Sequence, residues 1–366
     1  MKKIIIFIIA VILVLSAIAG CSAQDGSAPS QIVPEPAATV PAPLNDPIET
    51  PQPPPEPVQE PVGRVFSVVA QIFPQYDWVR QITGDRADSF EMTLLLDNLI
   101  DLHNFNPSVQ DIVRIGAADL FIYVGGDSDD WVEDILAQAA NPDMIVINLM
   151  ESLGDSVKLQ EIIEGMDDGD DHGHSHGHND SHNDEEEEHY DEHVWLSLRN
   201  AISLSYVIAD AISVLDPENI DEYRANLSAY IVELVRLDAE YESAVSAASG
   251  DVLLFGDRFP FRYFCDDYNL RYYAAFTGCS AETEASFSTI AFLTNRVNDL
   301  NLSYVMVTEC SDQSIANTIV NNSRARNQQV LVMDSMQSVT SSDVANGVTY
   351  LGVMRENLNV LIQALS

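Results

Sequence analysis

The sequence predicts an α/β fold with two lobes, each built on a four-stranded, mostly parallel sheet flanked by helices, and one long rigid helix joining them. Three observations support this prediction. The chain has 366 residues, of which 46% are hydrophobic, which is enough for two cores once the non-globular parts are subtracted. Strand-like runs alternate with helical stretches in two separate series. Between the series lies an apolar pattern at helical spacing.

The predicted strands form two sets of four. In the first lobe, residues 63–200, runs rich in Val, Ile, Phe and Leu predict strands at 65–73, 90–96, 119–124 and 144–149. In the second lobe, residues 250–366, similar runs predict strands at 252–255, 271–275, 304–308 and 329–333. Because helical or polar stretches separate these strands, we expect parallel sheets with helices on both faces.

The segment between the lobes, residues 201–249, is predicted to hold the connecting helices. One helix covers 199–215, and a second runs from Pro217 to about residue 248, with Asp216 as its N-cap. At 1.5 Å per residue the second helix would be about 48 Å long. Such a helix would brace both lobes and permit small tilts rather than a wide hinge.

The first 21 residues are organised like a bacterial lipoprotein signal peptide. Lys2 and Lys3 precede an unbroken apolar run that ends in small residues followed by Cys21. In such a lipobox the cysteine is lipidated and becomes the mature N-terminus. The alternative is an ordinary N-terminal anchor helix with an incidental cysteine. We expect an exported protein, anchored to the cell membrane through acylated Cys21, rather than a cytosolic enzyme.

Residues 22–62 are predicted to be a disordered tether. Twelve of the 17 prolines fall in this segment, and such a composition favours extended polyproline II over a packed core. The tether would hold the globular part away from the bilayer.

The composition excludes several classes of protein. The chain has 57 Asp and Glu residues against 17 Lys and Arg, a formal net charge of −40. Nucleic acid is therefore not an expected partner, because phosphate backbones require basic patches. Four cysteines without C-x-x-C spacing argue against a zinc ribbon or an iron–sulfur protein. After lipidation three cysteines remain, and the sequence does not choose among their pairings: Cys265, Cys279 and Cys310.

Seven of the eight histidines lie between residues 172 and 193. Six of them lie among Asp and Glu residues in a segment with no apolar residue to fold on, so a disordered loop is predicted at 167–191. Neutral imidazoles suit Zn²⁺, and the carboxylates raise the local cation concentration. We expect metal capture rather than a merely solvated acidic loop, and the capturing side chains are His172, His174, His176, His178, His182 and His189.

Residues 189–193 match H-x-x-E-H, a zinc-peptidase signature. That chemistry requires both histidines on one face of a regular helix. The first half of the motif belongs to the acidic run instead, so a zinc-dependent peptidase is kept only as an alternative.

Four segments of the chain resemble the metal-ligand segments of the zinc/manganese ABC-transporter solute-binding proteins. They occur in the family's order: DLHNFNPS at 101–108, DEHVWL at 191–196, GDRFPFRYF at 256–264 and LVMDS at 331–335. A His-rich loop before the second segment is typical of the zinc-importing branch. The resemblance implies two α/β lobes joined by one long helix, with the metal between them.

The resemblance also implies a set of ligands. His103 and His193 match ligand histidines, and Asp334 matches the family's carboxylate ligand. For Asp334 the alternative is a helix N-cap. The family's third ligand, His or Glu, falls on Arg258, a permanent cation that does not coordinate zinc. Carboxylates are expected to take its place, with Arg258 beside one of them, and the candidates are Asp257, Glu282 and Glu284.

The sequence therefore predicts a receptor without enzymatic activity. It would be a lipid-anchored, extracytoplasmic monomer that captures Zn²⁺ in a cleft between the lobes and delivers it to an ABC import permease. A site with two histidines and two carboxylates is harder than one with three histidines, so a manganese receptor is an alternative. A surface adhesin with a structural metal is another.

Overall fold

The computed structural model describes residues 64–97, 101–166, 189–278 and 284–366. The predicted signal peptide with Cys21 and the predicted tether lie outside these ranges. So do Cys279, Glu282 and the predicted loop histidines from His172 to His182. Pro61–Ser366 forms one compact unit, and the description below concerns that unit.

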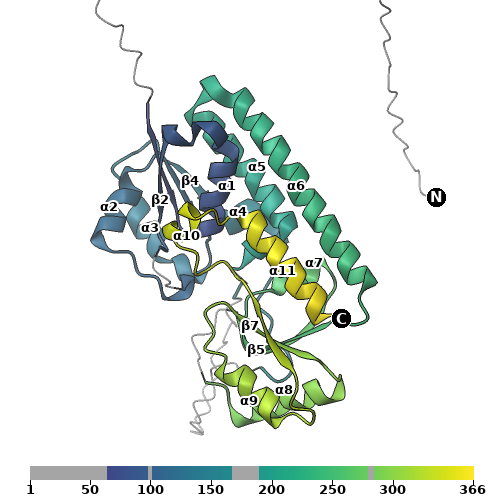
Figure 1. Cartoon of the computed structure of the whole chain (residues 1–366). Helices are drawn as coiled ribbons and strands as arrows, with labels where there is room; N and C mark the ends of the chain where they lie inside the picture. The colour runs from purple at the N-terminus through teal and green to yellow at the C-terminus, as the bar shows by residue number, and fades with distance from the viewer. Residues whose placement is uncertain (1–63, 98–100, 167–188, 279–283) are drawn as a thin grey trace, which may run out of the picture. The chain divides into compact units, whose positions relative to one another are not determined.

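Two four-stranded sheets with parallel pairing form the centres of the two lobes, as predicted (Figure 1). The first has the order β2-β1-β3-β4 and consists of β1 (Phe66–Ala70), β2 (Phe90–Leu94), β3 (Leu120–Tyr123) and β4 (Ile145–Asn148). The second has the order β6-β5-β7-β8 and consists of β5 (Val252–Phe259), β6 (Arg271–Thr277), β7 (Tyr304–Thr308) and β8 (Gln329–Met333). The eight predicted strands are confirmed.

Most strand ends lie within one or two residues of the prediction, and two differ by more. The first strand was predicted to reach residue 73 but ends at Ala70, because α1 begins at Phe73 with Pro74 in its first turn. Strand β5 was predicted to end at residue 255 and continues to Phe259, with a shift in its pairing to β6 between Phe255 and Arg258. Such an irregularity re-aims the side chains that follow it, and Arg258 is one of them.

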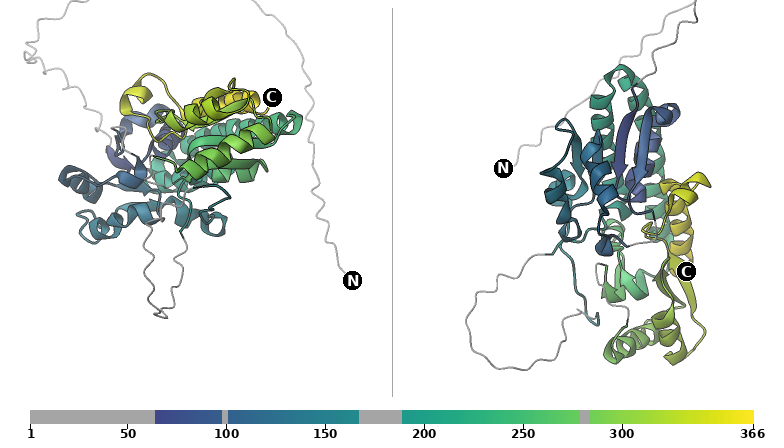
Figure 2. Two further views of the ribbon diagram at one scale, coloured as in Figure 1. Left: turned by 90° about the horizontal axis from the view of Figure 1, so that it is seen from below. Right: turned by 90° about the vertical axis from the view of Figure 1, so that its left-hand side faces the viewer.

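Helices cover both faces of each sheet (Figures 1 and 2). In the first lobe α1 (Phe73–Thr83) lies on one face, and α2 (Val109–Ala117) and α3 (Trp131–Leu136) lie on the other. In the second lobe α8 (Phe287–Asp299) and α9 (Ser314–Asn322) cover one face, opposite α7 (Arg262–Asp267). The remaining short helices are α4 (Leu149–Leu153) and α10 (Ser341–Ala345).

The long connecting helix is α6 (Ile220–Ala247), which runs beside α5 (Leu198–Leu215) (Figure 1). Its 28 residues make it about 42 Å long. It bonds to both lobes: Asn226 Nδ2 donates to Ile82 O at 3.0 Å, and Tyr268 OH donates to Asp238 Oδ1 at 2.9 Å. These contacts suit the predicted bracing role.

The start of α6 differs from the prediction. A 3-10 turn, Pro217–Asn219, precedes it, and Asp216 makes no capping bond from its side chain. Its carboxylate instead accepts hydrogen bonds from Tyr223 OH at 2.6 Å and Asn219 Nδ2 at 2.7 Å.

Helix α5 is the one described helix long and apolar enough to cross a membrane by composition. Leu204 and Ile208 on it are fully buried within the protein, so it is a core helix here.

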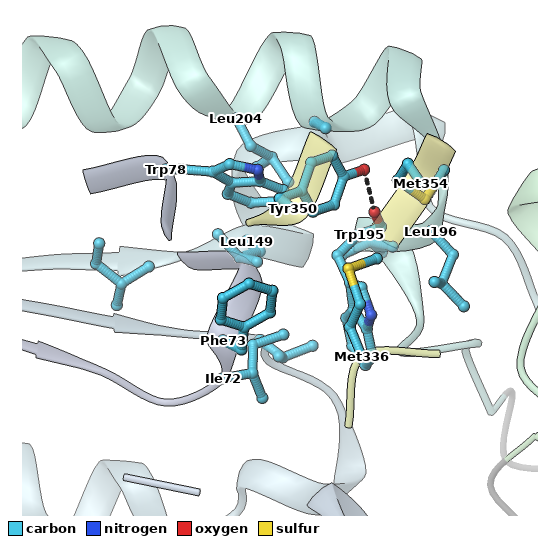
Figure 3. Close-up of a cluster of buried hydrophobic side chains, with 14 of the residues drawn as sticks. Ile72, Phe73, Trp78, Leu149, Trp195, Leu196, Leu204, Met336, Tyr350 and Met354 are labelled. Atoms are coloured by element: carbon cyan, nitrogen blue, oxygen red, sulfur yellow. Dashed lines mark hydrogen bonds between the residues drawn. The ribbon is translucent and has the colours of Figure 1, made fainter. Parts of the chain in front are cut away.

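The end of the chain returns to the first lobe. Helix α11 (Tyr350–Ala364) begins with Tyr350, whose ring packs edge-on against Trp78 of α1 and whose hydroxyl donates to Trp195 O at 2.7 Å (Figure 3). Tyr350 N donates to the buried carboxylate of Asp77 at 2.9 Å. The predicted second lobe, residues 250–366, therefore contributes its last helix to the core of the first.

Candidate metal centre

His103 lies in a short 3-10 turn, Leu102–Asn104, after the described end of β2. The side chain of Asp101 caps this turn by accepting a hydrogen bond from His103 N at 3.0 Å. Leu102 is fully buried and anchors the turn in the first core. Open α/β sheets bind ligands beyond the carboxyl ends of their strands, and His103 lies in such a place.

His193 is fully buried and stands before another 3-10 turn, Val194–Leu196. Its backbone N–H donates to Asp191 Oδ1 at 2.9 Å, and the same oxygen lies 3.0 Å from its ring Nδ1. Trp195 packs beside the imidazole, and its Nε1 donates to Ser335 O at 2.9 Å. Ser335 follows Asp334, so this bond links the second and fourth ligand segments.

The two predicted ligand histidines meet. His103 Nε2 lies 3.4 Å from His193 Nε2, and the rings are inclined at 62°. Ninety positions separate the two residues in sequence. The fold thus directs two ring nitrogens from distant segments toward the same point.

The Nδ1 atom of His103 faces a polar pair. Ser128 Oγ lies 2.7 Å from it and Glu192 Oε2 lies 3.2 Å from it. The other oxygen of Glu192 accepts a hydrogen bond from Ser128 N at 2.8 Å. Burial by itself would raise the pKa of Glu192, but the contacts with His103 and Ser128 outweigh it and lower that pKa below its usual range.

Glycine is required at two positions around the site, one beside Glu192 and one beside His193. Gly126 has a φ of +88°, and a Cβ there would lie 2.6 Å from Glu192 Oε1. A Cβ on Gly278 would lie 2.8 Å from His193 Cε1 and 2.8 Å from Phe259 O. Both positions leave room that a larger residue would remove.

The predicted carboxylate ligands are placed differently from one another. Asp257 Oδ2 accepts hydrogen bonds from Thr308 N at 3.0 Å and Thr308 Oγ1 at 2.7 Å. Glu284 is exposed. Asp334 is half-buried, and burial, followed by the negative charge of Glu309, raises its pKa to about 7.

These carboxylates do not complete a metal site in the described part of the chain. There, neither imidazole has a hydrogen-bond contact with Asp257, Glu284 or Asp334. No three His, Cys, Asp or Glu side chains of the described ranges meet in an arrangement that would hold a metal. The structure therefore shows a pair of nitrogen donors and leaves the oxygen donors apart from them.

Arg258 pairs with an acid that sequence reasoning did not consider. Its Nη1 lies 2.8 Å from Asp101 Oδ2, whereas its predicted partners were Asp257, Glu282 and Glu284. A cavity of about 100 Å³ adjoins this pair, lined by Asp101, Arg258, Pro260, Gly278, Thr308, Glu309, Cys310, Ser335 and Gln337.

Sequence reasoning missed three acids that contact the histidines, Asp101, Asp191 and Glu192, and a fourth acid, Glu309, that acts on Asp334. A signal existed for two of them, because Asp101-Leu-His103 and Asp191-Glu-His193 share the pattern D-x-H. In both cases the aspartate accepts the histidine's backbone N–H. Glu309 accepts bonds from Ser335 and Gln337 and so fixes the turn after Asp334.

Residues 189–191 were predicted to end the disordered loop, yet they pair with residues 158–160. Tyr190 forms a bridge with Leu159, Gln160 N donates to His189 O at 2.8 Å, and Asp191 N donates to Lys158 O at 2.9 Å. We call residues 158–160 and 189–191 the stem. Tyr263 of α7 joins the stem to the second lobe, since its hydroxyl accepts from Lys158 N at 3.0 Å and donates to Asp191 O at 2.7 Å.

The stem also excludes the peptidase arrangement. His189 is exposed and its Nδ1 lies 2.6 Å from Asp127 Oδ2, whereas His193 is buried beside His103. Residues 189–193 form a bridge and an irregular segment rather than a helix, so the two histidines do not share a helix face. The H-x-x-E-H match is therefore incidental.

Two of the three remaining cysteines do not form a disulfide with each other. Cys265, buried in α7, and Cys310, exposed after β7, are both free thiols. Cys279 lies outside the described residues.

Comparisons with known proteins agree with the resemblance. Residues 68–364 match the family described as zinc-uptake complex component A, periplasmic. The zinc-binding lipoprotein AdcA of Streptococcus pneumoniae is 29% identical over 299 residues, covering 81% of this chain and 55% of that protein. The chain thus spans about half the length of this relative. The high-affinity zinc uptake system protein ZnuA of Bacillus subtilis is 25% identical, covering 83% of this chain and 88% of that protein. The crystal structure of the Zn(II)-bound ZnuA-like domain of Streptococcus pneumoniae AdcA superposes with a TM-score of 0.62 at 26% identity, covering 82% of this chain and 99% of that domain.

Proposed function

The chain belongs to the family of zinc-uptake complex component A, and on that premise we propose that it is an extracytoplasmic receptor that captures Zn²⁺ and delivers it to an ABC import permease. This is a family of transport components and not of enzymes, so binding and release are the whole of the activity. Zinc is the cargo, and His103 and His193 are the proposed nitrogen ligands.

The distance between the two imidazoles carries the proposal. Zinc binds imidazole nitrogen at 2.0–2.1 Å and prefers tetrahedral geometry, so two nitrogens on one ion stand about 3.3–3.4 Å apart. The observed separation of His103 Nε2 and His193 Nε2 is 3.4 Å. The separation therefore matches that of two nitrogens on one zinc ion.

We propose Asp334 as the carboxylate ligand from the second lobe. Its raised pKa reflects burial and the negative charge of Glu309, and a bound cation would relieve both costs. Asp257 is a weaker candidate because Thr308 already satisfies one of its oxygens twice. Glu284 and Glu282, which lies outside the described residues, stay predictions. Two imidazoles favour zinc over manganese, which prefers oxygen ligands.

Competition against a chromophoric zinc chelator tests the site. The wild-type chain should bind one zinc ion tightly. In His103→Ala or His193→Ala the zinc affinity should fall by more than the roughly 10- to 100-fold that follows loss of a residue supporting a ligand. His189→Ala is the matched control, because His189 contacts Asp127 in the stem region, and it should keep the tight site. Tight binding that survives His103→Ala would overturn the assignment.

The same titration shows which of the candidate carboxylates binds zinc. Asn or Gln variants of Asp334, Asp257, Glu282 and Glu284 should leave three affinities near wild type and reduce one severely. We expect the severe loss in Asp334→Asn. If all four variants bind as wild type does, the oxygen donors come from elsewhere.

The location and partners of the protein belong to the same proposal. We propose that Cys21 is acylated and holds a monomer at the outer face of the cell membrane, within reach of the permease. Cys21→Ala should abolish incorporation of a labelled fatty acid into the protein. Persistence of the label would show another attachment site. The predicted loop histidines would collect zinc weakly beside the site.

A further inference from the structure

Asp191 and Glu192 are consecutive in sequence, yet they contact different imidazoles. Asp191 Oδ1 lies 3.0 Å from Nδ1 of His193, and Glu192 Oε2 lies 3.2 Å from Nδ1 of His103. His103 belongs to another segment of the first lobe, so Glu192 reaches across from the second ligand segment to the first. One dipeptide thus places a carboxylate beside the same ring atom of both histidines.

The two acids favour one of the two ring nitrogens as the place of the proton. An ionised carboxylate only accepts hydrogen bonds, so an Nδ1 atom that faces one carries the hydrogen. Beside His103 Nδ1 the hydroxyl oxygen of Ser128 is nearer, at 2.7 Å, and it can accept the same hydrogen. The tautomer inferred from these partners places the lone pair of each ring on Nε2. The two Nε2 atoms lie 3.4 Å apart, a separation that a cation bound to both would span.

We propose that Glu192 is a positioning residue that orients His103, fixes its tautomer and thereby presents its Nε2 to the metal. The inference rests on the proposed function, because presenting Nε2 matters only if the protein binds zinc. Its evidence is the geometry of the metal-free protein. Carboxylate partners of ligating histidines fix the ring and raise its basicity.

The surroundings of Glu192 are built for this contact. The residue is 2% exposed, and Oε1 is occupied by Ser128 N. Within the described ranges Oε2 has no conventional hydrogen-bond partner and faces the imidazole of His103. Gly126 supplies the space for the side chain, since a Cβ there would lie 2.7 Å from Glu192 Cγ.

The test combines zinc affinity with the tautomer of the metal-free protein. Full-length protein with ¹⁵N-labelled histidine is prepared as wild type, Glu192→Gln and Glu192→Met, with Asp127→Asn as the control. Asp127 lies close to Ser128 in sequence but its carboxylate contacts His189 instead. Long-range ¹H–¹⁵N correlation identifies the protonated nitrogen of His103, assigned with His103→Ala.

Glu192→Met should weaken zinc binding by about 10- to 100-fold and mix the two tautomers of His103, because the carboxylate partner is lost. Glu192→Gln retains an acceptor oxygen, so it should keep the tautomer and lose less affinity. Asp127→Asn should match wild type in both measurements. Wild-type affinity together with an unchanged tautomer in Glu192→Met would overturn the proposal.

Two further outcomes are decisive. If Glu192→Met does not fold, wild-type affinity in Glu192→Gln would overturn the electrostatic part of the role. If the wild-type chain binds no zinc, the proposed function fails, and the tautomer of His103 still reports on Glu192 without any metal.

Discussion

Arg258 Nη1 lies 2.8 Å from Asp101 Oδ2, and the other oxygen of Asp101 caps the turn that carries His103. The resemblance predicts the third ligand of the family at the position of this arginine, which is a cation and does not coordinate zinc. Asp101 neutralises it. Pairs of this partly exposed kind contribute only about 0–1 kcal/mol to stability. The main consequence is positional, because the pair ties the second lobe to the first ligand segment.

Gly278→Ala should weaken zinc binding while the fold stays intact. The added Cβ would meet His193 Cε1 and Phe259 O at 2.8 Å, so the imidazole must move away from its present place. We expect zinc affinity to fall at least roughly tenfold, as it does when a residue that supports a metal ligand is lost. Chelator competition and thermal unfolding measure the two effects. Gly250→Ala is the control, since its nearest contact would be Leu365 O at 3.9 Å. Equal affinities in the two variants would contradict the prediction.

Replacing residues 167–188 with a short Gly-Ser linker should remove the weak zinc sites and keep the tight one. The replacement spares the stem, in which Asp191 supports His193. Extending it through residue 191 should also weaken the tight site, because Nδ1 of His193 then loses its carboxylate. Equilibrium dialysis with metal analysis counts both kinds of site. If the shorter replacement loses the tight site although the protein is folded, the loop itself supplies a ligand.

Tyr263→Phe should destabilise the fold and reduce zinc affinity together. The hydroxyl is buried and bonds to two backbone groups of the stem, Lys158 N and Asp191 O. Leaving them unpaired costs about 1–3 kcal/mol. Denaturant unfolding gives the stability, and chelator competition gives the affinity. Tyr206→Phe removes a half-exposed hydroxyl of α5 and should change neither quantity. A loss of stability with unchanged zinc affinity would show that the stem does not influence zinc binding.

Asp129 should make the metal-free protein less stable as the pH rises from about 4 to 7. Burial raises the pKa of Asp129 from 3.8 to about 7, although hydrogen bonds from Gly125 N and Gln71 Nε2 act to lower it. In this interval the folded state holds a proton that the unfolded state has released, so the free energy of unfolding falls with rising pH. Below the interval the contribution is fully present, and above pH 7 it is lost.

Urea unfolding of wild type and Asp129→Asn across this range measures the effect. The difference between them should shift in favour of the variant by at most about 1.4 kcal/mol per pH unit and become constant above pH 7. Asp130→Asn, an exposed neighbour, controls for the loss of one carboxyl group. A difference that does not vary with pH would show that Asp129 titrates normally.

The sequence by itself determined the eight strands, the connecting helix and the two histidines. Each depends on a local pattern: apolar runs bounded by turns, helical spacing from residue 217 onward, and the segments around His103 and His193 that resemble the family's ligand segments. Local patterns are reliable here because strands buried on both faces need continuous apolar runs. The strand ends were less certain, as the start of α1 at Phe73 shows.

Only the tertiary structure decided which charged groups meet. Arg258 pairs with Asp101 across 157 positions, and Glu192 supports His103 rather than its own neighbour His193. The return of α11 to Trp78 and Trp195 was equally invisible in the sequence. Carboxylates are abundant in this chain, and any of them could in principle accept from an arginine or an imidazole. The choice is made by distance and direction, which the irregularity in β5, the stem and the packing of the two lobes set in space.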